Sequence, residues 1–237
     1  EPKSIDPQIL TDHNAIVMAT SLWEGLTRIG KDGQVIPGAA EKWEVNGNVW
    51  KFFIRENAKW SNGDKVTAND FYFAIKRAID PKTASEYAYM TFYIKNAQKF
   101  NEGKITDFNE VGVKVIDEKT LEITLEAPAA YFAAVLAFPT YFPVNQKVYE
   151  ENKGSYALEA KQAVYNGPWK MAEWQHDNKM VVVKNENYWN NKEIKLDKIE
   201  YVMIENANTA ANMYKNNKID MTVIQTDQIK QFKNSKE

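Results

Sequence analysis

The side chains that could carry catalytic chemistry are few and scattered. The chain has only two histidines, His13 and His176, and neither has a second histidine or a carboxylate at the spacing of a zinc motif. It has no cysteine, which excludes thiolate metal ligands, thiol catalysis and disulfides. No Gly-x-Ser-x-Gly nucleophile elbow and no glycine-rich phosphate loop occurs. We therefore expect no catalytic residue, no metal site and no cofactor, and we expect His176 to be a solvated residue in a turn.

Carboxylates are the one plentiful reactive group, with 32 Asp and Glu residues in the chain of 237. A suitably spaced pair could act as the acid and base of a glycoside hydrolase. Most of them alternate with lysines, as in Glu193-Ile194-Lys195 and Asp197-Lys198, which is typical of a solvated, salt-bridged surface. A secreted carbohydrate-active hydrolase is thus a remote alternative.

The composition is typical of a globular protein. Hydrophobic residues make up 44% of the chain, and 30 basic residues nearly balance 32 acidic ones. This balance argues against a nucleic-acid partner, which requires a basic face. The longest apolar stretch, residues 129–138, is shorter than the roughly 20 residues that span a bilayer. Aromatic residues reach 13%, which fits either a large aromatic core or a binding cleft.

Hydrophobic periodicity and turn residues predict hairpins and helices in the first half. Asn46-Gly47 suits a tight turn and joins two β-rich segments, 43–45 and 49–54, into a hairpin. Thr67 and Asp70 form a shortened capping box at the start of a helix that ends at Asp80-Pro81. Further elements are expected over 15–26 (helix), 111–115 with 121–125 (hairpin) and 127–138 (helix).

The pattern changes after residues 144–147, where we place a domain boundary. Strands are expected over 169–174, 179–184, 198–204 and 219–224, and helices over 207–216 and 227–233. The order strand–helix–strand across 198–224 predicts a βαβ unit and therefore a parallel sheet.

Eight short sequence motifs, which we call phrases, occur along the chain in an order typical of one protein family. They are 1–7, 22–26, 37–43, 53–63, 66–71, 166–171, 185–189 and 218–221. Together they resemble the extracellular solute-binding proteins of ABC importers, in the peptide- and nickel-type large-ligand family. The phrase from Asp80 to Tyr87 is similar to the oligopeptide-binding branch.

The resemblance implies an α/β fold: a periplasmic-binding-protein-like (type II) lobe built on a mixed sheet with flanking helices, plus an inserted α+β subdomain. Residues 1–26 and 146–237 would form part of lobe one, and residues 27–145 the insert. In the family a second lobe follows and closes on the ligand by a hinge motion. That lobe is expected to be absent from this sequence, which would make it a truncated fragment.

The resemblance also implies ligand contacts in three places. These are Thr11, Asp12 and His13 after the Asp-Pro phrase; Tyr87 in the insert; and Val223, Ile224 and Gln225 after the Ile-Asp pair. An example of the family carries Tyr-Asn where this chain has Val223-Ile224, so side-chain hydrogen bonding is lost there while backbone pairing to an extended peptide remains possible. Thr11 to His13 could equally be a plain helix cap, and Tyr87 a packing residue.

The function that the resemblance implies is capture of oligopeptides for import, without catalysis. The expected partners are an oligopeptide ligand and an ABC permease, and the full-length protein is expected to be a monomer. It would be extracellular or periplasmic and anchored to the cell surface by lipid. Haem, a chelated metal or a peptide pheromone are alternative ligands of the same fold.

Overall fold

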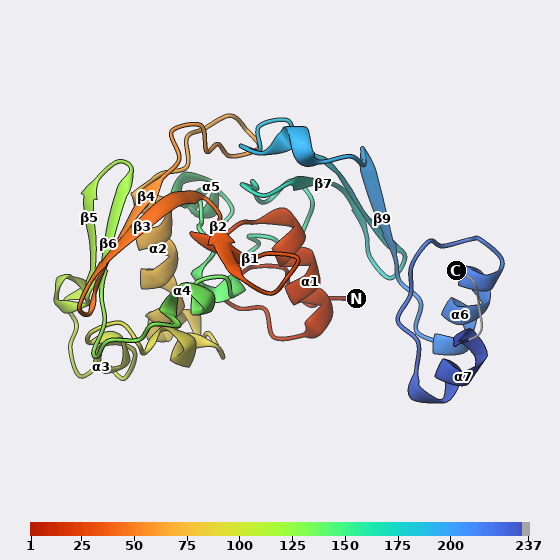
Figure 1. The fold of residues 1–237 in the computed structure, drawn as a ribbon, viewed down its shortest axis with the longest axis horizontal. Coiled ribbons are helices and arrows are strands. Elements are labelled where there is room, and N and C mark those ends of the chain that lie inside the picture. The colour runs from red at the N-terminus through yellow and green to blue at the C-terminus, as the bar shows by residue number, and fades with distance from the viewer. Residues whose placement is uncertain (234–237) are drawn as a thin grey trace.

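Helix α1 (His13–Leu22) follows an irregular N-terminal segment in the computed structural model, which describes residues 1–233 (Figure 1). Asp12 caps this helix, because its side chain accepts a hydrogen bond from the Ala15 N–H. The helix was expected to run to residue 26 but ends at Leu22, since the backbone becomes extended at Trp23. The extended exit buries Trp23 and Leu26 in the core.

Antiparallel hairpins build the next part of the chain: β3–β4 and β5–β6 were predicted from the sequence, and β1–β2 was not. Strands β1 (Thr27–Ile29) and β2 (Val35–Pro37) pair with each other, and a four-stranded sheet follows in the order β3-β4-β6-β5. Its strands are β3 (Ala40–Asn46), β4 (Val49–Ile54), β5 (Val113–Asp117) and β6 (Thr120–Thr124). Gly47 takes the positive φ of +61° that the β3–β4 turn requires.

Helix α2 (Ala68–Ile79) packs against β5 and β6. The predicted capping box is present, with the Thr67 N–H donating to Asp70 Oδ2 at 2.7 Å. The helix ends before Pro81, also as predicted.

Short helices connect these elements and support one another. They are η1 (Pro81–Thr83), η2 (Ala88–Thr91), α3 (Ala97–Asn101), η3 (Phe108–Glu110), α4 (Phe132–Val135), η4 (Pro139–Tyr141) and α5 (Gln146–Glu151). The helix expected over 127–138 shrinks to α4. Prolines at 128 and 139 bracket it, and its last turn tightens to three-residue hydrogen bonds at Ala137 and Phe138.

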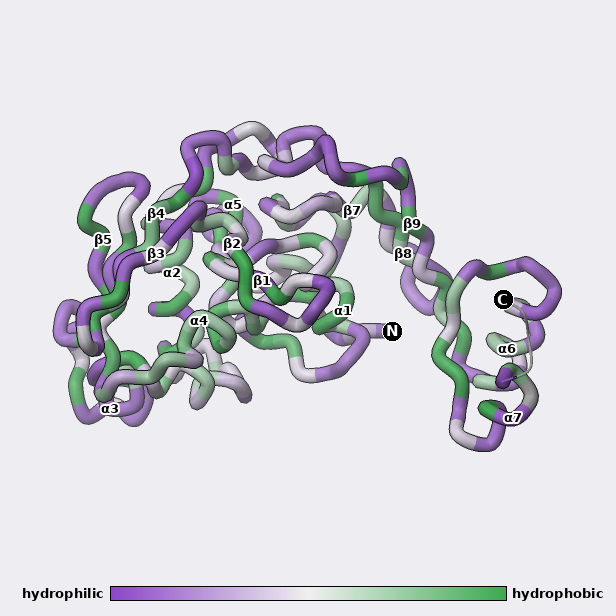
Figure 2. Tube along the Cα trace, in the orientation of Figure 1, coloured by the Kyte–Doolittle hydropathy of each residue, from purple (hydrophilic) through white to green (hydrophobic). Residues whose placement is uncertain are grey.

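A three-stranded antiparallel sheet forms the second half. Its strands are β7 (Trp169–Gln175), β8 (Lys179–Lys184) and β9 (Lys198–Val202), in the order β7-β8-β9, with η5 (Asn191–Glu193) before β9. It leads to a small C-terminal unit that holds α6 (Ala207–Lys215), η6 (Thr226–Gln228) and α7 (Ile229–Phe232) (Figure 1). Figure 2 shows hydrophobic segments within this unit.

The predicted strand over 219–224 is wrong, and so is the parallel βαβ unit. Every strand pairing within residues 1–233 is antiparallel. A strand needs a neighbour for its backbone N–H and C=O groups. The segment after α6 has none in the described part of the chain, and the side chains of Met221 and Val223 are 86% and 80% exposed. Across residues 1–233, no helix combines the length and apolarity needed to cross a bilayer.

The hydrophobic core is continuous from the first helix to the β7–β8 hairpin. It contains Trp23 from the exit of α1, Trp60 and Phe71 from the segment predicted as an insert, and Tyr165 and Trp169 from beyond residue 146. The division into lobe and insert stays a prediction.

A buried ion pair fastens the N-terminal segment to α2. Arg77 donates to both carboxylate oxygens of Asp6, and it also donates to Gln8 Oε1 at 2.7 Å. Gln8 in turn donates to the carbonyls of Thr140 and Phe142 at 3.3 and 3.0 Å. Burial alone would lower the pKa of Arg77, but the hydrogen bond and charge of Asp6 raise it above its ordinary value.

We predict that Arg77→Met destabilises the protein by about 3–5 kcal/mol, because it leaves the Asp6 carboxylate buried without a counter-charge. Urea unfolding measures the change. Lys65→Met is the control, since its ion pair with Glu118 is exposed and should cost less than about 1 kcal/mol. Equal losses in the two variants would contradict the role given to Arg77.

Candidate functional site

The first group of predicted ligand residues lies at the start of α1. Asp12 Oδ1 accepts the Ala15 N–H at 2.9 Å, so this carboxylate is engaged as a helix cap. Thr11 and His13, on either side of it, have exposed side chains. Of the three, Thr11 and His13 are therefore the side chains best placed to meet a ligand.

Tyr87 lies directly before η2 and is half-buried. Its ring packs edge-on against Phe138 with centroids 5.1 Å apart, and lies 6.0 Å from the ring of Tyr89. Tyr87 thus has the packing role that the sequence left open for it, while part of its ring reaches the surface.

One short helix supports both of these groups. Helices α1 and η2 each pack against η4, and Tyr141 of η4 donates to the Met90 carbonyl at 2.8 Å. The Gln8 amide ties the segment that leads to Thr11 onto the same region, through the carbonyls of Thr140 and Phe142. The structure therefore ties the segments that carry Thr11, His13 and Tyr87 to the same short helix.

The third predicted group, Val223 to Gln225, lies apart from the others in the C-terminal unit (Figure 1). Among the described residues, no hydrogen bond involves the backbone of residues 219–224. The Gln225 N–H donates to Gln228 Oε1 at 2.9 Å and so begins η6. The structure does not bring this group against α1 or η2, so its role in ligand binding stays a prediction.

The buried carboxylate of Glu24, which was not predicted as a functional residue, connects three segments that are far apart in the sequence: 22–26, 53–63 and 185–189. Glu24 accepts hydrogen bonds from Tyr188 Oη at 2.6 Å and from Trp189 Nε1 at 2.5 Å. Arg28 approaches the same carboxylate at 3.6 Å, and the Arg55 guanidinium lies 3.6 Å from the centre of the Trp189 ring. A charged residue within the otherwise apolar phrase 22–26 was the sequence signal for this cluster.

The backbone beside Glu24 is locked to residues 166 and 167. Asn166 accepts the Glu24 N–H at 3.0 Å and donates to the Glu24 carbonyl at 2.8 Å, as a second strand would. The Gly167 N–H donates to the Leu22 carbonyl at 2.9 Å. We call residues 22–26, 165–169 and 185–189 together the central junction.

Burial raises the pKa of Glu24 above its ordinary value, whereas the hydrogen bonds from Tyr188 and Trp189 and the charges of Arg28 and Arg55 oppose that rise. A pocket of about 390 Å³ opens beside the junction, lined in part by Trp23, Glu24, Arg28 and Tyr188.

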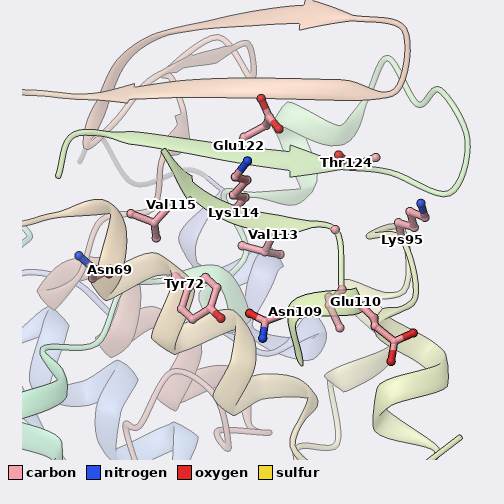
Figure 3. A pocket seen from close by; sticks show the side chains of 12 residues that line it. Asn69, Tyr72, Lys95, Asn109, Glu110, Val113, Lys114, Val115, Glu122 and Thr124 are labelled. Atoms are coloured by element: carbon pink, nitrogen blue, oxygen red, sulfur yellow. The ribbon is translucent and has the colours of Figure 1, made fainter. Parts of the chain in front are cut away.

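A larger groove of about 650 Å³ lies between β5 and α2. Figure 3 shows Tyr72 of α2 and Asn109 of η3 beside Val113 of β5. Charges of both signs surround it, including Lys114 and Glu122. None of the ligand residues predicted from the sequence lines this groove.

The histidine expected in a turn does lie in one, and it is paired. His176 follows β7 with half of its side chain exposed, and its two ring nitrogens lie 3.1 Å from Glu159 and 2.6 Å from Glu1. Hydrogen bonds that the protonated ring donates to Glu159 and then to Glu1 raise the pKa of His176 above its ordinary value. Within residues 1–233, no three His, Asp or Glu side chains are grouped so that they could hold a metal ion.

Comparison with known proteins places this arrangement in a family. The model of the bacterial extracellular solute-binding proteins, family 5, matches residues 34–237. The chain belongs to this family. A family 5 relative, the dipeptide-binding protein DppE of Bacillus subtilis, is 41% identical over 226 residues, which are 94% of this chain and 41% of the relative.

Solved structures of similar proteins show the same fold. The substrate-binding domain of an oligopeptide ABC transporter from Bacillus anthracis superposes with a TM-score of 0.95 at 39% identity, over 99% of this chain and 45% of that one. Listeria monocytogenes OppA bound to peptide gives 0.93 at 36% identity, over 99% and 47%. The α/β, periplasmic-binding-protein-like fold is confirmed, and this chain spans less than half the length of these relatives.

The junction around Glu24 yields a stability prediction. We predict that Glu24→Gln costs about 1–3 kcal/mol, because the amide offers one acceptor oxygen where the carboxylate accepts from both Tyr188 and Trp189. The midpoint of urea unfolding at neutral pH is the measurement.

Glu186→Gln is the matched control. Glu186 also belongs to the central junction, but its side chain is 69% exposed and that of its partner Lys170 is 32% exposed. It should change stability by less than about 0.5 kcal/mol. A Glu24→Gln variant as stable as this control would show that the buried carboxylate does not hold the junction.

Proposed function

We propose that this chain is part of a substrate-binding protein that captures oligopeptides for an ABC importer. The observation that carries the proposal is the match of almost the whole chain, at a TM-score of 0.93, to a relative bound to peptide. The exposed side chains of Thr11 and His13 and the ring of Tyr87, mounted on η4, support it as a preformed part of a binding face.

The mode of capture that we propose relies on backbone groups. The backbone of residues 219–224, which has no hydrogen-bond partner in the described structure, would pair with the main chain of an extended peptide. Such pairing is independent of the ligand's sequence. Val223 and Ile224 add no side-chain hydrogen bond, so this site would accept varied peptides, with water bridging to their side chains.

The remaining features of the proposal concern the whole protein. Residues 1–26 and 146–237 would belong to one ligand-binding lobe and residues 27–145 to an inserted subdomain, and a second lobe would close over the peptide. The protein would act as a monomer without enzymatic activity, deliver its ligand to a membrane permease and be held at the cell surface by lipid.

Calorimetric titration tests the proposal on protein expressed from the complete reading frame. Short peptides such as trialanine and trilysine should release or absorb measurable heat. Tyr87→Ala should weaken their affinity by about tenfold, because the proposed contact between the ring and the peptide is lost.

Tyr72→Ala is the matched control, since Tyr72 packs edge-on against Phe108 at 5.0 Å, much as Tyr87 packs against Phe138. It should leave peptide affinity unchanged. An absence of heat with every peptide would overturn the proposal. A haem absorbance band in protein purified from its host would show that the ligand is haem and not a peptide.

A further inference from the structure

Two uncharged aromatic segments lie side by side in the predicted insert. Residues 87–93 read Tyr-Ala-Tyr-Met-Thr-Phe-Tyr, and residues 131–138 read Tyr-Phe-Ala-Ala-Val-Leu-Ala-Phe. Neither contains a charged residue, in a chain where charged residues make up 26%. We call their surface rings, Tyr87, Tyr89, Tyr93, Tyr131 and Phe138, the aromatic strip.

Ring contacts at both ends set the two segments antiparallel. Tyr87 meets Phe138 at 5.1 Å, and Tyr93 meets Tyr131 at 5.7 Å, so the start of one segment lies beside the end of the other. Both contacts are edge-to-face, the favoured geometry for aromatic pairs. The buried Tyr141 fixes the middle of the strip from below by donating to the Met90 carbonyl.

Three of the five rings of the aromatic strip are largely exposed to solvent, so core packing alone does not explain them. The side chains of Tyr89, Tyr131 and Tyr93 are 55%, 59% and 37% exposed. Tyrosine offers a large amphipathic contact area at a low cost in side-chain entropy, which is why it is favoured on binding surfaces. Clustered exposed rings therefore indicate a contact surface.

The position and length of the strip indicate what it contacts. It begins at Tyr87, which the proposed function places against the ligand, and the Tyr87 ring lies 6.0 Å from that of Tyr89. The six steps from Tyr87 to Tyr93, with η2 over residues 88–91, span about 12 Å at the roughly 2 Å rise of a 3₁₀ helix. An extended peptide covers that distance with three or four residues, at about 3.3 Å each.

We propose that the aromatic strip is a side-chain subsite for the peptide ligand, and that it selects peptides bearing an aromatic side chain over peptides with acidic or small ones. This inference rests on the proposed peptide-binding function and adds a preference to it. Uncharged rings offer edge-to-face contacts to an aromatic side chain, whereas a carboxylate would lose hydration there and meet the negative faces of the rings.

The test compares tetraalanine with its single-phenylalanine and single-glutamate variants, titrated into protein from the complete reading frame. At least one phenylalanine variant should bind about tenfold more tightly than tetraalanine, and no glutamate variant should. The double variant Tyr89→Ala/Tyr131→Ala should lose this preference and keep its affinity for tetraalanine. Tyr89→Phe/Tyr131→Phe, which retains the rings, should keep both.

Ile116→Ala is the control for loss of exposed apolar surface elsewhere, since Ile116 is 44% exposed on β5. The tetraalanine affinity reports whether each variant is folded, and the single alanine variants replace the double one if it is not.

A double alanine variant that still prefers phenylalanine overturns the inference. So does one that binds every peptide as the wild type does but fails in import, which would make the strip a permease contact. If no peptide binds the wild type, the proposed peptide-binding function is overturned, and the inferred subsite is overturned as well because it rests on that function.

Discussion

The close approach of Gly167 to the end of α1 is the contact on which the rest of the structure depends. A Cβ atom at this glycine would lie 2.6 Å from the Leu22 carbonyl oxygen and 2.9 Å from the Trp23 nitrogen, so a larger residue cannot take the place without moving backbone. This approach lets Asn166 bond both backbone groups of Glu24. It also brings Glu24 within reach of Tyr188 and Trp189, and it joins segments more than 140 residues apart.

The candidate ligand face follows from this junction through a short chain of contacts. The junction fixes the end of α1, and the Asp6–Arg77 pair with Gln8 fixes the segment before its start. Helix α1 in turn packs on η4, which also carries η2 and the neighbouring Tyr87. Thr11, His13 and Tyr87 therefore keep their relative positions because two buried polar clusters hold the helix at both ends. A preformed face of this kind reduces the ordering cost of binding.

The sequence predicted correctly those elements whose structure depends only on the backbone preferences of a few neighbouring residues. The Asn46-Gly47 hairpin, the Thr67–Asp70 capping box and the helix end at Pro81 were all predictable, because each depends on backbone preferences of a few residues. Residues 219–224 have the composition of a strand, but a strand also requires a neighbour, which no local pattern reveals. Glu24 was missed for the same reason: its partners lie 164 and 165 residues away. Among the predicted ligand residues, the capping role of Asp12 could be predicted from the sequence. The packing of the segments that carry Thr11 and Tyr87 on the same helix, η4, could not, because it depends on the tertiary fold.

The most direct test of this account is the stability of Gly167→Ala, measured by urea unfolding together with amide hydrogen exchange at residues 22–26 and 185–189. The account predicts a loss of about 1–3 kcal/mol and faster exchange in both segments, because the added methyl forces the backbones apart. Gly30→Ala is the control, since a Cβ there comes no closer than 3.3 Å to its neighbours. Stability and exchange that match those of Gly30→Ala would contradict the claim that this close approach holds the fold together.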